Sequence, residues 1–318
     1  MTHTETRNYD VVIVGGGAAG LSAALVLGRA RRRVAVVDAG EPRNAPASHM
    51  QGYLSREGMA PADLLATGRA EVAGYGVDLF EDQVAEVEVG FVVCLTGGRV
   101  LQARRILVAT GAHDELPEIP GVRERWGRDL LHCPYCHGWE VRDQPLGVLG
   151  THAASVLHAQ LVRQWSDDVV FFAHTYELTS TEHAELEARG IRIVSGEVLR
   201  LVVEDDHLTG VELEDGQVLA RTAVFIRPAI VPHPDGLLAA LDCDSDGTGF
   251  VTVDASGKTS TPGVWAAGNV ADPRAQVITA AGAGSAAAIA VNADLIEEDV
   301  RVAVERVYRV TSGDRTNE

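Results

Sequence analysis

Two cysteines separated by two residues, Cys133 and Cys136, give the strongest sign of chemistry in this sequence of 318 residues. The spacing is typical either of a redox-active dithiol or of half a zinc site. A structural zinc site needs four ligands, and the other two cysteines, Cys94 and Cys243, lie far away in the sequence. We therefore interpret the pair as redox-active. Cys94 lies in an apolar segment and is expected to be a small core residue, whereas Cys243, in an acidic loop, is expected to be incidental.

A histidine, His137, follows the second cysteine directly. The attacking species in dithiol chemistry is the thiolate, and an ordinary imidazole titrates near neutral pH. His137 is therefore a candidate catalytic base that deprotonates a thiol, and the alternative is a solvated loop histidine. His132 and Glu140 are the nearby groups that could take the same role.

A glycine-rich segment near the N-terminus predicts a dinucleotide-binding turn. Residues 11–14 are an apolar strand, residues 15–20 read Gly-Gly-Gly-Ala-Ala-Gly, and residues 21–30 form a helix. The next strand, 34–38, ends in Asp38, at the spacing of about 20 residues that suits a ribose hydroxyl. The alternative is a glycine-rich turn without a ligand. The residues predicted to surround the pyrophosphate, at a helix N-terminus, are Gly15, Gly17, Ala18, Ala19 and Gly20.

Three further segments indicate that the dinucleotide is FAD. Residues 261–269 resemble the second flavin motif of flavoenzymes with two dinucleotide-binding domains, which contacts the ribityl chain. The usual aspartate of that motif is Asn269 here, after Gly268, so its contact would come from a neutral amide. The other two segments are the strand end Thr110-Gly111, which matches the same enzymes, and a helix start near Gln276-Val277, whose amides would point at the flavin.

The elements that position these motifs form two similar units. A second strand–helix–strand unit covers residues 146–173, with a strand ending near Leu149, a helix over 153–165 and a strand over 169–172. A late apolar strand is expected at 263–267, and an alanine-rich helix follows it from 277 to 295.

Proline-rich stretches separate the middle unit from its flanks, at 117–120 and at 228–234. The chain is therefore predicted to be α/β, with two Rossmann-like dinucleotide-binding domains, the second inserted into the first. The FAD-binding domain would comprise residues 1–116 and 235–318, and the inserted NAD(P)H-like domain, with its Cys-x-x-Cys pair, residues 117–234.

The ordered set of motifs resembles the low-molecular-weight thioredoxin reductase family over nearly all of residues 8–297. The resemblance implies a thioredoxin-reductase-like fold and a redox-active Cys133–Cys136 disulfide that faces the flavin. It also implies that Cys136 is the thiol nearest the flavin, that Cys133 exchanges with substrate, and that the protein is a homodimer.

Two departures from that family affect the expected function. The turn of the inserted unit has His152 where the family has glycine, and an imidazole there would obstruct a pyrophosphate. After the next strand, the basic cluster that would hold a 2′-phosphate is replaced by His174 with Glu177 nearby. A divergent but working NAD(P)H site is the alternative interpretation.

The second departure is His137 itself, which stands where the family has aspartate. This version resembles the dithiol oxidases that close disulfides in microbial natural products such as gliotoxin, holomycin and romidepsin. We therefore expect an FAD-dependent dithiol oxidase with a small-molecule dithiol substrate and O2 as electron acceptor, giving H2O2. The alternatives are a disulfide reductase driven by NAD(P)H or ferredoxin, and a flavin-binding redox sensor without turnover.

Composition narrows the possible partners. The formal net charge of −18 argues against nucleic acid and anionic membrane surfaces. Residues 11–28 carry no charge, but strand, turn and helix explain them better than a membrane span does. The polar N-terminal segment, 1–10, lacks a secretory signal, so a cytoplasmic location is expected.

Overall fold

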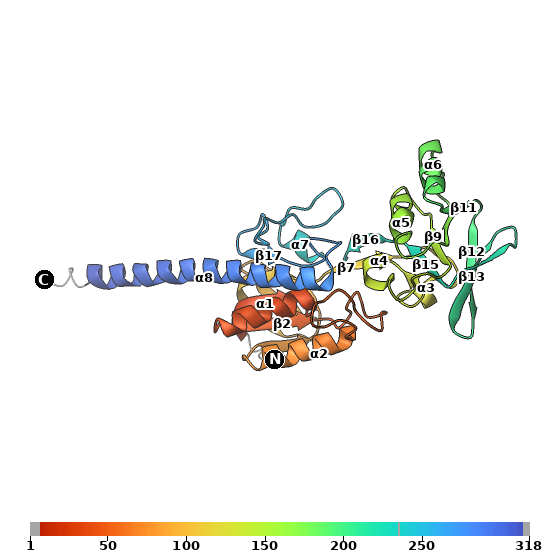
Figure 1. Cartoon of the computed structure of the whole chain (residues 1–318). Coiled ribbons are helices and arrows are strands. Elements are labelled where there is room, and N and C mark those ends of the chain that lie inside the picture. The colour runs from red at the N-terminus through yellow and green to blue at the C-terminus, as the bar shows by residue number, and fades with distance from the viewer. Residues whose placement is uncertain (1–6, 235, 314–318) are drawn as a thin grey trace. The chain divides into compact units, whose positions relative to one another are not determined.

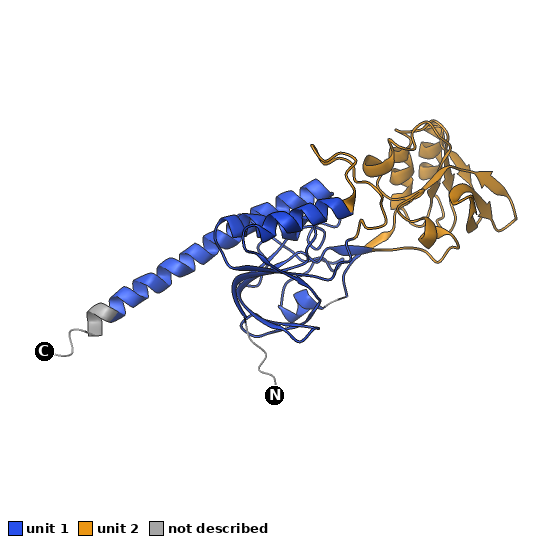
Figure 2. Cartoon of the chain, turned by 90° about the horizontal axis from the view of Figure 1, so that it is seen from below, with its two compact units in different colours: residues 1–42, 62–113, 231–318 blue, residues 43–61, 114–230 orange. Residues whose placement is uncertain are grey.

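The computed structural model describes residues 7–234 and 236–313 and divides the chain into two compact units (Figure 2). Unit 1 comprises Met1–Pro42, Ala62–His113 and Val231–Glu318, and unit 2 comprises Arg43–Pro61 and Asp114–Ile230. Each unit is built on its own mostly parallel sheet, in agreement with the predicted α/β class.

Unit 1 contains a seven-stranded sheet with the order β3-β2-β1-β6-β5-β4, to which β17 is added beside β6. The strands β3, β2, β1, β6 and β17 run parallel, whereas β5 and β4 form an antiparallel edge. Parallel strands are covered on both faces, which is why residues 11–14 and 34–37 are apolar without alternation. The strands are β1 (Arg7–Val14), β2 (Val34–Asp38), β3 (Asp78–Glu81), β4 (Val84–Glu88), β5 (Val92–Leu95), β6 (Val100–Val108) and β17 (Val264–Ala266).

One face of this sheet is covered by helices α1 (Ala18–Arg29), α2 (Pro61–Ala73) and α8 (Val277–Gly313). The small helix α7 (Leu237–Ala240) belongs to the core of the other face. Helix α1 and the first part of α8 pack closely together, because glycine and alanine dominate where they touch.

Helix α8 is longer than the sequence analysis expected. The predicted helix ends at Leu295, which is the last fully buried residue of α8, but the helix continues to Gly313. The described side chains from residue 299 to 309 are all exposed, and Figure 1 shows this part of α8 leaving the body of unit 1. By length and composition alone α8 could cross a membrane, which is weak evidence because the buried residues of its first half belong to the core.

Unit 2 contains a five-stranded parallel sheet with the order β11-β10-β9-β15-β8. A three-stranded antiparallel sheet, β12-β13-β14, packs into its core on one face. The strands β7 and β16, which cross the unit limits at 113/114 and 230/231, pair with each other in a separate ribbon. The strands are β7 (Ala112–Glu115), β8 (Leu130–Leu131), β9 (Leu146–Leu149), β10 (Val169–Phe172), β11 (Arg192–Val194), β12 (Val198–Glu204), β13 (His207–Leu213), β14 (Val218–Ala220), β15 (Ala223–Ile226) and β16 (Ala229–Pro232). The helices are α3 (Val122–Arg125), α4 (Pro134–His137), α5 (Ala154–Val162) and α6 (Ser180–Ala188).

The proline-rich stretches lie within a few residues of the unit limits at 113/114 and 230/231. Residues 43–61, which the sequence analysis assigned to the first domain, group with unit 2 instead. Part of the reason is a tight contact, since a Cβ added at Gly127 would lie only 2.8 Å from Pro46.

Candidate active site

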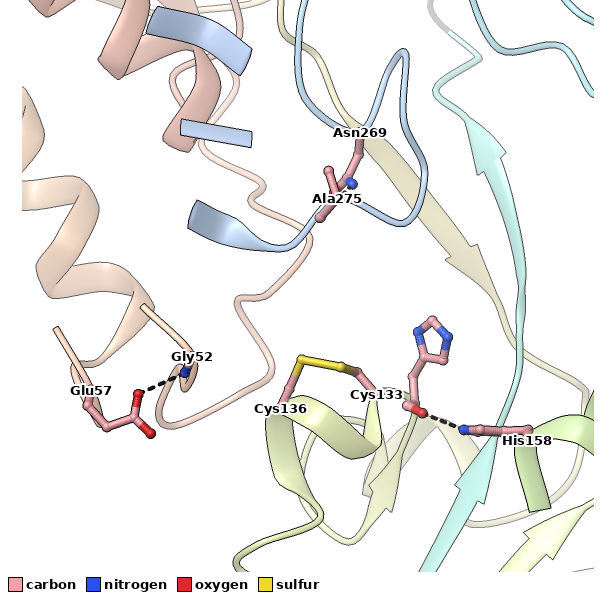
Figure 3. The surroundings of a disulfide bond; sticks show 8 residues. Gly52, Glu57, Cys133, Cys136, His158, Asn269 and Ala275 are labelled. Atoms are coloured by element: carbon pink, nitrogen blue, oxygen red, sulfur yellow. Dashed lines mark hydrogen bonds between the residues drawn. A yellow bond between two sulfur atoms is a disulfide. The ribbon is translucent and has the colours of Figure 1, made fainter. Parts of the chain in front are cut away.

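Cys133 and Cys136 are joined by a disulfide bond at the start of the short helix α4 (Figure 3). Pro134 occupies the first turn of α4, where its missing N–H costs no hydrogen bond. The amides of Cys136 and His137 both donate to the carbonyl oxygen of Cys133 at 3.1 Å, which closes the turn around the disulfide. Gly138 follows the turn. Glycine is needed at this position because a Cβ there would lie 2.6 Å from the Pro134 carbonyl oxygen.

The backbone before the disulfide is held by a buried histidine of α5. The Nε2 atom of His158 lies 2.8 Å from the carbonyl oxygen of His132, the residue before Cys133 (Figure 3). A carbonyl oxygen only accepts, so Nε2 carries the proton and donates it. Burial lowers the pKa of His158 to about 4, so the ring is neutral at neutral pH. Its Nδ1 atom has no hydrogen-bond partner among the residues that the structure describes.

His132 itself lies next to an ion pair within unit 2. The guanidinium of Arg43 holds the carboxylate of Asp114 through two hydrogen bonds, of 2.9 and 2.6 Å. Burial lowers the pKa of the His132 imidazole to about 4, against the opposing effect of the Asp114 charge. An imidazole with so low a pKa is a much weaker base than an ordinary one, which makes His132 a poor candidate for thiol deprotonation.

His137 is the last residue of α4 and is half-buried, so it is not the solvated loop histidine of the alternative interpretation. It lines a cavity of about 820 Å³ in unit 2 together with Gln51 and Glu140, which are hydrogen-bonded to each other at 3.3 Å. Burial lowers the pKa of His137 below its usual value, against the opposing effect of the Glu140 carboxylate. Burial thus favours the neutral ring, which has a nitrogen lone pair to accept a proton. Its role as the catalytic base stays a prediction.

The glycine-rich turn of unit 1 has the close contacts that a dinucleotide-binding turn requires. Gly15 has φ +107°, and a Cβ there would collide with the backbone of Ala109. A Cβ at Gly20 would overlap the carbonyl oxygen of Gly15, so α1 can approach the end of β1 only with glycine at that position. Nothing lies within 4 Å of the Cβ position of Gly17, and Gly17 provides no side chain to cap the amides that begin α1 at Ala18. This open N-terminus fits a pyrophosphate.

Asp38 lies at the end of β2, half-buried beside the turn. Its Oδ1 atom accepts a hydrogen bond of 3.0 Å from the Gly16 amide, and its Oδ2 atom lies 2.6 Å from the Arg69 guanidinium of α2. These contacts orient the carboxylate at the carboxyl end of the parallel strands, where such folds bind ribose.

The remaining predicted flavin residues gather at the same sheet edge. Thr110 and Gly111 follow β6, and Gly268 and Asn269 follow β17, which pairs with β6. The side-chain amide of Asn269 donates to the carbonyl oxygens of Asp272 at 2.9 Å and Ala275 at 3.0 Å. It therefore shapes the loop that leads into α8, as the facing positions of Asn269 and Ala275 in Figure 3 illustrate. Gln276 and Val277 lie at the first turn of α8, where the helix was expected to begin.

The corresponding turn of unit 2 is bonded to its own chain. The Nε2 atom of His152 lies 3.0 Å from the carbonyl oxygen of Arg227, directly after β15. The Thr151 amide donates to the Ser155 hydroxyl at 3.3 Å. His174, after β10, has a positive φ of 51° and accepts a hydrogen bond from the Val198 amide through Nδ1 at 3.0 Å. Both imidazoles are thus engaged with backbone, at the two positions where the sequence analysis expected this chain to have lost the phosphate-binding groups.

Cys94 is not the core residue that the sequence analysis expected. In β5 the buried side chains are Val93 and Leu95, so the alternation of the strand turns Cys94 to the half-exposed face. There its thiol lies 3.8 Å from the Glu88 carboxylate. Cys243 is also partly buried, and it packs against the core of unit 1.

The sequence analysis did not identify four residues that surround the predicted site residues. They are Arg69, which holds Asp38, the ion-paired Arg43 and Asp114, and His158. Only His158 left a local signal, as a titratable residue on the buried face of α5 with Val156, Ala159 and Val162. The partners of the other three are distant in sequence, so no spacing indicates them.

Comparison with known proteins shows that the sequence is similar to disulphide oxidoreductases over most of its length. The family model for pyridine nucleotide-disulphide oxidoreductases matches residues 9–285. Thioredoxin reductase sirT of Leptosphaeria maculans is 30% identical over 315 residues, covering 92% of this chain and 96% of that protein. Thioredoxin reductase tcpT of Claviceps purpurea is 29% identical over 277 residues, covering 82% and 86%.

Two solved structures have the same fold along nearly the whole chain. The crystal structure of HlmI has a TM-score of 0.93 and 58% identity, covering 96% of this chain and 98% of that one. The thioredoxin reductase of Streptococcus pyogenes has a TM-score of 0.83 and 25% identity, covering 92% and 100%.

Proposed function

Because the chain belongs to the pyridine nucleotide-disulphide oxidoreductase family, whose enzymes are flavoproteins, we propose that it is an FAD-dependent dithiol oxidase of the cytoplasm. Its substrate is a small-molecule dithiol of the kind found in microbial natural products, which it converts to a cyclic disulfide. O2 receives the two electrons and becomes H2O2. One observation carries the proposal: unit 2 has a disulfide at Cys133 and Cys136, and in the same unit His152, in the nucleotide-type turn, and His174, after β10, are bonded to the chain itself.

The residues of unit 2 suffice for the thiol–disulfide exchange. His137 takes the proton from one substrate thiol, and the resulting thiolate attacks the sulfur of Cys133. The Cys133–Cys136 bond breaks, Cys136 leaves as a thiolate, and the substrate is held in a mixed disulfide. The second substrate thiol then attacks the substrate sulfur of that mixed disulfide. The cyclic product leaves as Cys133 is released and takes the proton of the second substrate thiol. Two electrons have then passed to the cysteine pair, and the two substrate protons are held by Cys133 and His137, with Cys136 as the thiolate.

FAD, when bound, supplies the chemistry that returns the cysteine pair to the disulfide and passes its electrons to O2. The residues of unit 1 that would hold it are the open α1 N-terminus after Gly17 for the pyrophosphate and Asp38 for the ribose. Asn269 would contribute its side-chain oxygen near the ribityl chain, since its NH2 group donates to the loop. Gly17 in particular leaves the space that a close approach of phosphate to backbone requires.

The decisive experiment is anaerobic mixing of the purified flavoprotein with either dithiothreitol or NADPH. We expect dithiothreitol to bleach the flavin and NADPH to leave it oxidised, and we expect readmitted O2 to restore the colour with release of H2O2. A Cys133→Ser variant, with the same flavin content, should not be bleached by the dithiol. Rapid bleaching by NADPH would contradict the oxidase proposal.

The main rival is a thioredoxin-reductase-like disulfide reductase, favoured by the names of the curated relatives. Rapid reduction by NADPH or by reduced ferredoxin, followed by reduction of a protein disulfide, would establish that function. A flavin-binding redox sensor would show a single reduction without repeated release of H2O2.

A further inference from the structure

Two hollows of unit 2 flank the disulfide helix α4. The first is the cavity of about 820 Å³ that His137 and Glu140 line. The second is a groove of about 650 Å³ between α4 and α5, and its wall includes Tyr135, Leu157 and Trp165. Both volumes lie in the range of about 300–1,000 Å³ that is usual for small-molecule sites. Volume therefore does not decide which hollow receives a dithiol substrate.

The turn of α4 places His137 on the same side as the cysteine that exchanges with substrate. Cys133 is the N-cap of α4, and the amide of His137, four residues later, donates to the Cys133 carbonyl oxygen at 3.1 Å. Residues four apart share one face of a helix, and helical side chains lean toward the N-terminus. Tyr135 is two residues from Cys133, which is about 200° around the helix. The cavity therefore lies on the Cys133 side of α4, and the groove lies on the opposite side.

The arginines in the wall of the cavity are paired within the chain. Arg125 holds Asp129 through two hydrogen bonds, of 2.7 and 2.6 Å, and contacts Asp206 at 2.8 Å. Arg128 also binds Asp206, at 2.9 Å. Hydrogen bonds to a ligand would therefore come mainly from the uncharged polar side chains of the wall, which are Ser48, Gln51, Gln144 and Thr222.

Gln51 is the member of this set that is tied to the residues around the candidate base. Its half-buried side chain donates from Nε2 to Oε1 of Glu140 at 3.3 Å, and Glu140 follows His137 by three residues. The bond uses one of the two N–H groups of the amide. The second N–H group and the Oε1 atom can serve a ligand as donor and acceptor.

We propose that the cavity lined by His137 is the substrate site, and that Gln51 selects dithiols whose scaffold carries hydrogen-bonding groups. The inference rests on the proposed function, because a thiol that His137 deprotonates has to lie within hydrogen-bond reach of its imidazole. The substrate sulfur then lies between His137 and Cys133, and the scaffold extends into the cavity toward Gln51. The groove beside Tyr135 takes no part in the exchange.

The test compares two substrates that differ only in their hydroxyl groups. Dithiothreitol is 1,4-butanedithiol with a hydroxyl group on each central carbon, and both close the same ring on oxidation. Quenched flow measures the second-order rate constant for cyclic disulfide formed in the first anaerobic turnover of the flavoprotein. We expect the wild type to prefer dithiothreitol. Gln51→Leu should reduce that preference about 5-fold, which corresponds to one hydrogen bond of about 1 kcal/mol.

The groove on the other side of α4 provides matched controls. Gln160 lines this groove, so Gln160→Leu should leave the preference unchanged. Two bulky substitutions test the location without reference to hydrogen bonding. Ala47→Trp, in the wall of the cavity, should slow both dithiols by on the order of 10-fold or more, whereas Leu157→Trp, in the groove, should slow neither. Flavin content and circular dichroism establish that all four variants are folded.

The outcomes separate this inference from the proposed function. A wild type that oxidises neither dithiol overturns the proposed function and the substrate site with it. Where the wild type oxidises both, an unchanged preference in Gln51→Leu overturns the substrate site alone. A loss of rate in Leu157→Trp without one in Ala47→Trp does the same and assigns the substrate to the groove.

Discussion

Replacing Gly284 with alanine should separate α1 from α8 and thereby disturb the dinucleotide turn. A Cβ at position 284 would overlap the carbonyl oxygen of Ala19 and would lie 2.7 Å from its carbonyl carbon and 2.8 Å from its Cα. The obstacle is backbone, which cannot rotate away as a side chain can. Ala19 belongs to the first turn of α1, so the cost of the new methyl group falls on the residues that would surround the pyrophosphate.

The same helix provides a matched control two residues earlier. Nothing lies within 4 Å of a Cβ at Gly282. Alanine is favoured over glycine inside a helix by about 1 kcal/mol, so Gly282→Ala should stabilise the protein by up to that amount. For Gly284→Ala the same gain is opposed by overpacking, which costs typically 1–3 kcal/mol and more where backbone has to move. With an overpacking cost of about 3 kcal/mol, the net loss is about 2 kcal/mol.

The measurement is urea unfolding of both variants, followed by circular dichroism, together with the amount of FAD released per chain on denaturation. Gly284→Ala should unfold at lower urea than the wild type and should be purified with less FAD, whereas Gly282→Ala should do neither. Equal midpoints and equal flavin contents for the two variants would refute the close approach of α1 and α8.

Three other predictions concern unit 2. Burial lowers the pKa of His158 to about 4 from 6.5, so on acidification the unfolded chain takes up this proton first and stability is lost between pH 6.5 and pH 4. His158→Gln should remove about 2 kcal/mol of the stability loss measured by urea unfolding between pH 7 and pH 5, and an unchanged loss would contradict this assignment. His137→Ala should retain FAD but slow dithiol-driven flavin reduction about 10²–10⁴-fold at pH 7, with a smaller effect at high pH, and a wild-type rate in stopped flow would exclude the base role. With FAD bound, Cys133→Ser should show a long-wavelength charge-transfer band from the Cys136 thiolate and Cys136→Ser should not, and the reverse pattern in absorption spectra would exchange their roles.

The elements that the sequence predicts well are those whose signal is local. The predicted strands 34–38 and 169–172 coincide with β2 and β10. Each is a short apolar run bounded by polar or turn-forming residues, and such a run indicates a buried strand. The end of α8 was predicted at Leu295 because the alanine-rich core pattern stops there. The described side chains from residue 299 to 309 are exposed, so a pattern of core residues does not indicate that the helix continues.

In the candidate site, too, the features with a local sequence signal were predicted and those without one were not. The Cys-x-x-Cys pair and the glycine-rich turn are contiguous in sequence and were recognised from spacing alone. The groups that hold them are brought together by tertiary structure, as the contact between His158 and the carbonyl of His132 illustrates. Cys94 was misassigned because a strand of four largely apolar residues does not reveal which face is buried until its neighbours are known.

The turn of unit 2 has a thermodynamic consequence. His152 is hydrogen-bonded to backbone directly after β15 and His174 to backbone at the start of β12, so the chain itself holds both rings. A domain that depends on a ligand gains stability in proportion to the logarithm of ligand concentration, and its melting temperature rises accordingly. Under the proposed function unit 2 gains no stability from a nicotinamide nucleotide, so its melting temperature should not rise when NADPH is added.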